Sequence, residues 1–210
     1  MIIVLLGLPG SGKGTQGQLL AEKLKVPILS TGDMFRHMLK SNEEEGVLLN
    51  SFISQGKLVP TKLVNQLVKK FLGQQEYKNG CIIDGYPRNL EQVKFLEEIT
   101  KQEIKAIYFQ VSEETIKKRI LGRFNCAECG KIYNSYYATP KVENVCDICK
   151  STNFTYRKDD DEQTLIKRIN EYNTETYPII DYYKKLGNLY SVDASKATDE
   201  VSIQLESLFR

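Results

Sequence analysis

A glycine-rich run near the start of the chain has the composition and spacing of a loop that binds phosphate. It reads Gly7-Leu8-Pro9-Gly10-Ser11-Gly12-Lys13-Gly14-Thr15 and lies between an apolar segment and a segment with helical periodicity. Glycines let a backbone approach phosphate without a Cβ in the way. The N–H groups of the loop and of the helix that follows then face the anion, and Lys13 reaches the terminal phosphates. We therefore predict that Gly10, Ser11, Gly12, Lys13, Gly14 and Thr15 bind a nucleotide polyphosphate.

Magnesium is expected to need a ligand outside this loop. Gly14 stands where Ser or Thr commonly follows the lysine, and Thr15 comes one place later. Asp84 ends the apolar run Cys81-Ile82-Ile83, and ligands bind at the carboxyl ends of strands in open α/β sheets. We predict that Asp84 holds magnesium through water, because this ion dehydrates reluctantly. The alternative is an aspartate that caps the next turn.

Arginine is rare in this chain, which makes its positions informative. The sequence has 22 lysines and seven arginines, and only arginine can bind phosphate with a planar, bidentate fork. Six of the seven gather in or beside two insertions and are candidates for phosphate binding, although a surface ion pair could explain any single one: Arg36, Arg88, Arg119, Arg123, Arg157 and Arg168. The only histidine, His37, is interpreted as an ordinary helix residue. Phosphoryl transfer needs positioning and charge neutralisation more than a base.

Four of the five cysteines form the pattern C-x2-C-x16-C-x2-C, as Cys126, Cys129, Cys146 and Cys149. This spacing is typical of a zinc site, and four thiolate ligands leave no open position for substrate. We predict one structural zinc ion per chain. Disulfides, another metal and an empty site are the alternatives. The fifth cysteine, Cys81, lies in an apolar run and is expected in the core.

Alternating strands and helices must position these residues. Apolar runs typical of buried strands cover 2–6, 81–83, 106–109 and 189–192. Helical patterns cover 15–24, 63–72, 90–99 and 113–121. The alternation predicts an α/β fold with a parallel sheet flanked by helices. Two insertions interrupt it, 30–59 and 122–158; we expect short helices at 33–39 and 47–53, and a further helix that begins at Arg168.

Composition excludes several classes of protein. The 210 residues are 41% hydrophobic and 27% charged, which are ordinary values for a globular protein. A formal net charge of +2 argues against a protein that binds polyanions in bulk. The longest apolar run, residues 1–6, is far below the roughly 20 residues of a membrane span. No secretory signal is recognised, so we expect a cytoplasmic protein without a membrane or nucleic-acid partner.

Together these motifs resemble adenylate kinase, in the long form with a zinc-binding lid. The resemblance rests on the phosphate loop, Ser30-Thr31-Gly32-Asp33 with Arg36, Asp84-Gly85-Tyr86-Pro87-Arg88, the cysteine segment and Arg157-Lys158-Asp159-Asp160. It implies reversible transfer of a phosphoryl group from ATP·Mg²⁺ to AMP, giving two ADP, by a monomer. It also implies the P-loop nucleoside monophosphate kinase fold with two inserted mobile subdomains. The core would comprise 1–29, 60–121 and 159–210, the AMP-binding insertion 30–59 and the zinc-binding lid 122–158.

The resemblance also implies roles for individual residues. On the ATP side, besides the phosphate loop, these are Arg119, Arg123, Ile132, Tyr133 and Lys196. On the AMP side they are Thr31, Arg36, Lys57, Leu58, Val59, Gly85, Tyr86, Pro87, Arg88, Gln92, Arg157 and Arg168. Gln92 would pair with the adenine edge, and the catalytic group would be Lys13, Arg88, Arg123, Arg157 and Arg168. Tyr86 stands where Phe is commoner, and its hydroxyl needs a partner or solvent.

Three other functions are open to this sequence. A UMP/CMP-type nucleoside monophosphate kinase would use another acceptor, against which the long cysteine segment and Gln92 argue. A nucleic-acid-binding P-loop protein would use the cysteine segment as a zinc ribbon, and its DNA binding would weaken with salt. A nucleotide-regulated switch would hydrolyse ATP slowly without AMP.

Overall fold

A five-stranded parallel sheet forms the centre of this computed structural model, which describes residues 1–40, 52, 59–157 and 159–209. The strand order is β2-β3-β1-β4-β8, and every neighbouring pair is parallel. The bounds are β1 Ile2–Leu6, β2 Ile28–Ser30, β3 Cys81–Asp84, β4 Ile104–Gln110 and β8 Leu189–Asp193. The predicted α/β fold with a parallel sheet is confirmed. The short strand β2 was not among the predicted strands.

Strand β1 is buried on both faces, which explains its uninterrupted apolar run. No residue of β1 is more than 2% exposed. Ile2, Val4 and Leu6 belong to one core cluster, whereas Ile3 and Leu5 belong to another. Helices therefore cover both faces of the sheet, as a parallel sheet requires.

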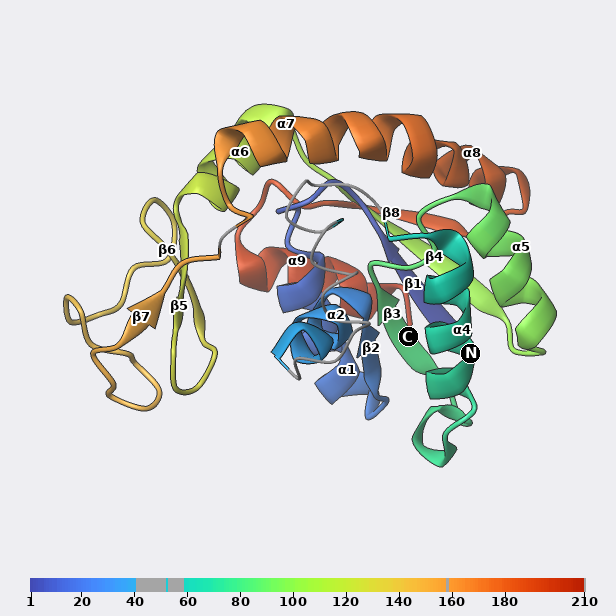
Figure 1. Cartoon of the computed structure of the whole chain (residues 1–210), viewed down its shortest axis with the longest axis horizontal. Helices are drawn as coiled ribbons and strands as arrows, with labels where there is room; N and C mark the ends of the chain where they lie inside the picture. The colour runs from blue at the N-terminus through green and yellow to red at the C-terminus, as the bar shows by residue number, and fades with distance from the viewer. Residues whose placement is uncertain (41–51, 53–58, 158, 210) are drawn as a thin grey trace.

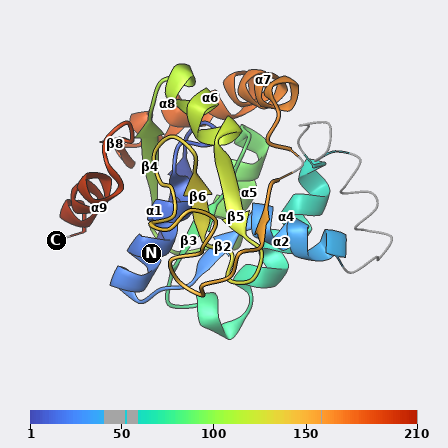
Figure 2. The same cartoon turned by 90° about the vertical axis from the view of Figure 1, so that its left-hand side faces the viewer.

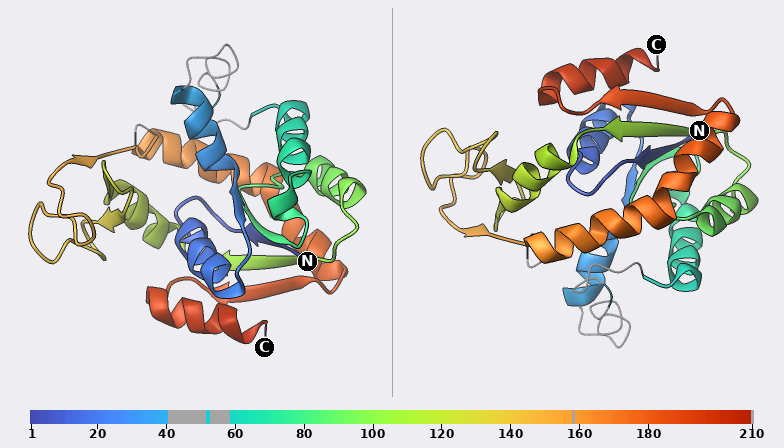
Figure 3. Two further views of the ribbon diagram at one scale, coloured as in Figure 1. Left: turned by 90° about the horizontal axis from the view of Figure 1, so that it is seen from below. Right: turned by 90° about the horizontal axis from the view of Figure 1, so that it is seen from above.

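The helices divide between these two faces. Their bounds are α1 Lys13–Leu24, α2 Thr31–Lys40, α4 Thr61–Leu72, η1 Gln75–Tyr77 (3₁₀), α5 Leu90–Ile99, α6 Glu113–Leu121, α7 Glu162–Glu171, η2 Tyr172–Thr176 (π), α8 Tyr177–Lys185 and α9 Thr198–Ser207. Helices α1 and α9 pack on one face, and α4, α5 and α8 pack on the other (Figure 1). The right-hand view of Figure 3 shows α7, η2 and α8 as one long rod across the sheet.

One of the predicted helices begins at a different residue in the structure. The helix expected to begin at Arg168 begins instead at Glu162, because the Asp161 side chain accepts a hydrogen bond from the Thr164 N–H, at 2.9 Å, as an N-cap does. Arg168 therefore lies well inside α7. The helix predicted at 33–39 is confirmed within α2. The one predicted at 47–53 lies outside the described residues, apart from residue 52.

A second, antiparallel sheet lies in the segment with the cysteines. Its order is β6-β5-β7, with bounds β5 Arg123–Cys126, β6 Ile132–Asn134 and β7 Phe154–Thr155. It has a small core of its own, in which Phe124 and Phe154 pack against buried Cys126, Tyr133 and Cys146. Figure 1 shows this sheet standing apart from the parallel sheet, beyond the end of α6, and in Figure 2 it faces the viewer in front of the core. The segment 122–158 thus carries secondary structure that is separate from the central layers.

Among the helices of the described residues, none combines the length and the apolar character that a membrane span requires.

Candidate active site

The phosphate loop (residues 7–15) joins β1 to α1 at the carboxyl end of the parallel sheet. Gly10 and Gly12 have φ of +78° and +95°, which L side chains rarely adopt. A Cβ at Gly10 would also lie 2.7 Å from Ile120 Cγ1 on α6. Glycine is therefore required by backbone conformation at both positions and by space at Gly10.

The ammonium group of Lys13 is folded back into this loop. Its Nζ donates hydrogen bonds to the carbonyl oxygens of Gly7, at 2.7 Å, and Leu8, at 2.8 Å. Burial lowers the pKa of Lys13 from 10.5 to about 8, and the nearby Asp84 carboxylate opposes this shift. The protein therefore keeps a partly buried cation at the place where the sequence predicts phosphates.

Asp84 lies beside the first turn of α1, at the end of β3. A Cβ at Gly14 would lie 3.4 Å from Asp84 Oδ2, whereas Thr15 is exposed. The hydroxyl of Thr31, only 1% exposed, donates to the backbone oxygen of Asp84 at 3.3 Å. The position after Lys13 thus faces a carboxylate, and the absence of a side chain at Gly14 leaves space there.

Arg88 is held in the loop that follows β3. Its guanidinium Nε donates to the Gly85 carbonyl oxygen at 2.7 Å, and its backbone N–H donates to Gln92 Oε1 at 2.7 Å. Burial, and next the positive charge of Arg168, lower the pKa of Arg88 to about 10. These two guanidinium groups are therefore close enough to repel one another.

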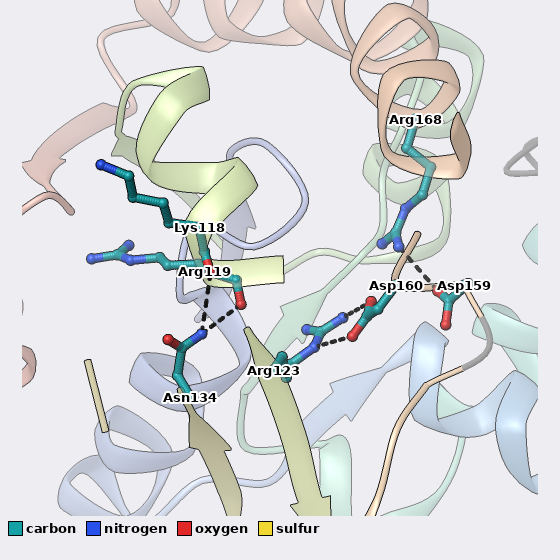
Figure 4. Close-up of polar contacts among 7 residues, drawn as sticks. All are labelled: Lys118, Arg119, Arg123, Asn134, Asp159, Asp160 and Arg168. Atoms are coloured by element: carbon teal, nitrogen blue, oxygen red, sulfur yellow. Dashed lines mark hydrogen bonds and ion pairs between the residues drawn. The ribbon is translucent and has the colours of Figure 1, made fainter. Parts of the chain in front are cut away.

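Two further arginines of the site are paired with consecutive aspartates. Arg123 makes a two-pronged contact with Asp160, at 2.7 Å from Nε and 2.5 Å from Nη2, and the Asp160 side chain is only 4% exposed. Arg168 Nη1 lies 3.0 Å from Asp159 Oδ2. Figure 4 shows both pairs, one at the start of β5 and the other below α7. Asp159 and Asp160 belong to one of the motifs that carry the family resemblance, but the sequence predicted no role for them.

Arg157 is the least satisfied of these cations. Its Nε is buried and has no hydrogen-bond partner within the described part of the chain. Burial, together with the positive charges of Arg123 and Arg36, lowers the pKa of Arg157 to about 10. A buried guanidinium nitrogen without a hydrogen-bond partner is unfavourable unless a ligand supplies the acceptor. The arginine cluster (Arg88, Arg123, Arg157 and Arg168) and Lys13 therefore form a site suited to a polyanion.

The four cysteines of the predicted metal site come together in space. Their Sγ atoms all lie within 4.8 Å of one another, with Cys126 and Cys149 at 3.4 Å and Cys129 and Cys146 at 3.5 Å. Two of the four are buried and two are exposed. In an ideal tetrahedral zinc site the sulfur atoms are about 3.8 Å apart. The donor set and its spacing thus suit a zinc ion.

A sequence model of the family described as Adenylate kinase matches residues 5–188. The chain belongs to the adenylate kinase family. It is 53% identical over 210 residues to the adenylate kinase of Rickettsia africae (strain ESF-5), covering 100% of this chain and 99% of that protein. The adenylate kinase of Rickettsia prowazekii (strain Madrid E) is 50% identical over 211 residues, with the same coverage. The predicted resemblance to adenylate kinase and the P-loop nucleoside monophosphate kinase fold are therefore confirmed.

The ATP-side residues predicted from the sequence lie around the phosphate loop and in segment 122–158. Arg119, on α6, donates a long hydrogen bond of 3.4 Å to the Ser11 carbonyl oxygen. Lys196 is exposed and follows β8, at the carboxyl edge of the sheet. Ile132 is 37% exposed, whereas the whole Tyr133 residue is only 2% exposed. Tyr133 packs inside segment 122–158, and its assignment to ATP binding stays a prediction.

The sequence did not point to Asn134, which connects the end of β6 to α6. Its Nδ2 donates to the Arg119 carbonyl oxygen at 2.8 Å, and its Oδ1 accepts from the Tyr136 N–H at 2.9 Å (Figure 4). A Cβ at Gly122 would lie 3.0 Å from the same Oδ1. Asn134, at the end of β6, thus caps the end of α6 and fixes this helix relative to the antiparallel sheet.

Besides Arg157 and Arg168, described above, the AMP-side residues predicted from the sequence lie on α2, at Val59 and in the segment after β3. Thr31 and Arg36 are on α2, and Arg36 pairs with Asp33 at 2.5 Å. Val59 is 7% exposed and belongs to the core. Lys57 and Leu58 lie outside the described residues.

The remaining AMP-side residues follow β3. Tyr86 is fully buried, and its hydroxyl donates to Asn65 Oδ1 at 2.9 Å, which supplies the partner that the sequence analysis required. Pro87 is also buried. Gln92 is 2% exposed, and its amide oxygen is bonded to Arg88. Tyr86, Pro87 and Gln92 therefore form the packed underside of the loop that presents Arg88.

Proposed function

We propose that the chain catalyses reversible phosphoryl transfer between ATP·Mg²⁺ and AMP, with Lys13 and the arginine cluster as its charge-neutralising groups. Its membership of the adenylate kinase family supports the reaction. The arginine cluster supports the assignment of residues, above all the buried Arg157 Nε that lacks a partner. In the forward direction the bond between the γ-phosphorus and the ADP oxygen breaks, and a bond to an AMP phosphate oxygen forms. Both products are ADP.

The two nucleotides would approach the cluster from opposite sides. We place the ATP phosphates on the backbone N–H groups of the phosphate loop, with Arg119 and Arg123 above them and Lys196 at the sheet edge. We place AMP between α2 and the loop after β3, where Arg36 and Arg88 lie and where Lys57 and Leu58 are also expected. The Gln92 amide oxygen has a second lone pair besides the one that Arg88 uses. It can therefore still accept from the adenine amino group.

Positioning and charge neutralisation account for the chemistry without a general base. The transferred group spreads negative charge over its oxygens, and preorganised cations stabilise that charge. Magnesium bound with ATP would neutralise the β- and γ-phosphates, and Asp84 would orient its water ligands. The Asp159 and Asp160 pairs would hold Arg168 and Arg123 in place until phosphate oxygens compete for them.

The lid and the AMP-binding insertion would exclude water during transfer. We retain the division into a core of 1–29, 60–121 and 159–210, an insertion of 30–59 and a lid of 122–158. The separate sheet and small aromatic core of the lid support this division. Closure would bring Arg123 and Arg157 to the phosphates and keep ATP from hydrolysis. The cytoplasmic location, the monomeric state and the absence of nucleic-acid partners stay predictions.

A screen of acceptors tests the assignment of AMP. With ATP and Mg²⁺ present, we expect rapid ADP formation with AMP and far slower turnover with UMP, CMP or GMP, followed by chromatographic separation of all nucleotides. Comparable rates with UMP or CMP would favour the UMP/CMP-type kinase instead.

The pKa of Lys13 predicts how ATP binding depends on pH. Burial lowers this pKa to about 8 in the free protein, so the side chain is charged below that pH and neutral above it. Bound phosphates favour the charged form and raise the pKa again. Binding of ATP at pH 9 should therefore take up close to one proton, and the Kd should rise by up to about tenfold per pH unit above pH 8.

Calorimetry in two buffers of different ionisation enthalpy measures this proton uptake. Lys13→Met is the control, because it removes the titrating group and should bind ATP more weakly without proton uptake above pH 8. Proton uptake that is the same in both proteins would assign the effect to another group.

We also propose that the four cysteines bind one structural zinc ion in the lid. Purified protein should contain one zinc per chain by mass spectrometry, and Cys126→Ser should lose it. Since the site holds no substrate, the variant should lose lid stability, seen as faster hydrogen exchange in 123–155, with less than about a tenfold change in kcat. Cys81→Ala, outside the group, should keep its zinc. Protein prepared with ample zinc that contains none would contradict the proposal.

A further inference from the structure

The π-helical turn η2 contacts the loop that presents Arg88. Thr176 is the last residue of this turn, and it is only 6% exposed. Its hydroxyl donates to the Arg88 carbonyl oxygen at 2.8 Å, across 88 positions of sequence. Isolated π-turns within α-helices are frequent at functional sites, and neither the family resemblance nor the reaction assigns Thr176 a role.

With this bond, both polar groups of the Arg88 backbone are fixed by buried side chains. The N–H donates to Gln92 Oε1 at 2.7 Å, from α5, and the carbonyl oxygen accepts from Thr176 on the opposite side. The guanidinium Nε is in turn bonded to the Gly85 carbonyl oxygen at 2.7 Å. The position of the Arg88 guanidinium therefore depends on where these two side chains hold its backbone.

The rod that carries Thr176 also carries Arg168. Arg168 lies on α7, and η2 follows α7 directly. In a π-turn the hydrogen bonds run from i to i+5, which widens the turn and changes the face on which the following side chains lie. The turn thus sets the orientation of Thr176 relative to Arg168 within one continuous rod (Figure 3).

We propose that Thr176 is a positioning residue that fixes Arg88 relative to the helical rod carrying Arg168. The two guanidinium groups then keep the spacing at which both can bind one phosphate. This inference rests on the proposed function, in which both arginines bind the AMP phosphate and the transferred group. The phosphate loop has no part in the contact. The effect of breaking it should therefore appear in the KM for AMP and in kcat, and not in the KM for ATP.

The test compares three variants of the full chain. Thr176→Val keeps the shape of the side chain but leaves the Arg88 carbonyl oxygen without its donor. We expect the KM for AMP to rise about tenfold and kcat to fall several-fold, while the KM for ATP stays within about twofold. Thr176→Ser retains the hydroxyl and should restore most of the AMP kinetics. Thr174→Val is the matched control, because this threonine of the same turn is exposed and bonds only to the Asn170 carbonyl oxygen among the described residues.

A residue that served stability alone would give a different pattern. Thr176→Val would then lower the melting temperature without raising the KM for AMP, and this result would overturn the inference. If the valine variant does not fold, Thr176→Ala compared with Thr176→Ser applies the same criterion. Arg88→Ala distinguishes a failure of the proposed role of Arg88 from a failure of the inference about Thr176. If it leaves the KM for AMP unchanged, the role of Arg88 fails and the inference with it; if it raises that KM and Thr176→Val does not, only the inference fails.

Discussion

Replacement of Lys13 by alanine is expected to lower kcat at least about a hundredfold while the melting temperature moves by less than about 3 °C. The loss of activity follows because the ammonium is the cation that the phosphate loop brings to the terminal phosphates of ATP. The small effect on stability follows because the variant loses bonds to the Gly7 and Leu8 carbonyl oxygens but also loses a partly buried charge whose pKa burial depresses to about 8. These two effects oppose one another.

A coupled assay of ADP formation and a thermal melt measure both quantities for Lys13→Ala. Lys101→Ala is the control, since Lys101 is exposed and follows α5, away from the phosphate loop. Its turnover should match that of the unaltered protein. Near-normal turnover in Lys13→Ala would remove Lys13 from its assigned role.

Arg88→Ala should have a comparable effect, with kcat lowered at least about a hundredfold and the KM for AMP raised. Arg88 is the member of the cluster whose backbone and guanidinium are both fixed in advance, by Gln92 and by Gly85. Such a group stabilises charge in the transition state without reorganisation. The substitution removes one of several mutually repelling cations, so the melting temperature should change little.

Arg88→Lys separates charge from geometry. A lysine keeps the positive charge but cannot contact a phosphate with two parallel N–H donors. We expect it to recover less than about a tenth of the lost activity. Full recovery by lysine would mean that Arg88 contributes charge alone, and near-normal turnover in Arg88→Ala would remove it from the catalytic group.

Features that depend on neighbouring residues could be predicted from the sequence. The apolar run of β1, the glycines of the phosphate loop and the cysteine spacing are local patterns, and each reflects a requirement of its own segment. Strand β2 could not be predicted in this way. Its three residues, Ile28–Ser30, are too few for periodicity, and only pairing with β3 makes them a strand.

Contacts between residues far apart in the chain could not be predicted from the sequence. Asp160 meets Arg123 across 37 positions, and Thr176 meets Arg88 across 88. No spacing rule relates such pairs, so the carboxylates that hold the arginines and the hydroxyl behind Arg88 were not predicted. The start of α7 was different, because Asp161 is a recognisable N-cap. It stands in a run of three aspartates, 159–161, so the sequence offers three adjacent candidates for the N-cap.

Burial also changes how one predicted residue is interpreted. Tyr133 was assigned to ATP binding, but its hydroxyl donates to Cys146 Sγ at 3.4 Å and accepts from the Asp147 N–H at 2.7 Å. A motif identifies the segment, and only the fold determines which way a side chain points. The Tyr133 side chain therefore supports the cysteine site, and almost no part of this buried residue faces solvent.

The most direct test of the account is the dependence of ADP formation on AMP. Protein is mixed with ATP and Mg²⁺, with and without AMP, and ATP, ADP, AMP and inorganic phosphate are all followed. Two ADP should form for each ATP consumed when AMP is present, with no release of phosphate. Without AMP, almost no ATP should be consumed. Equal ADP formation in the absence of AMP, with release of phosphate, would identify a hydrolase or a switch and would contradict the roles given to the arginine cluster.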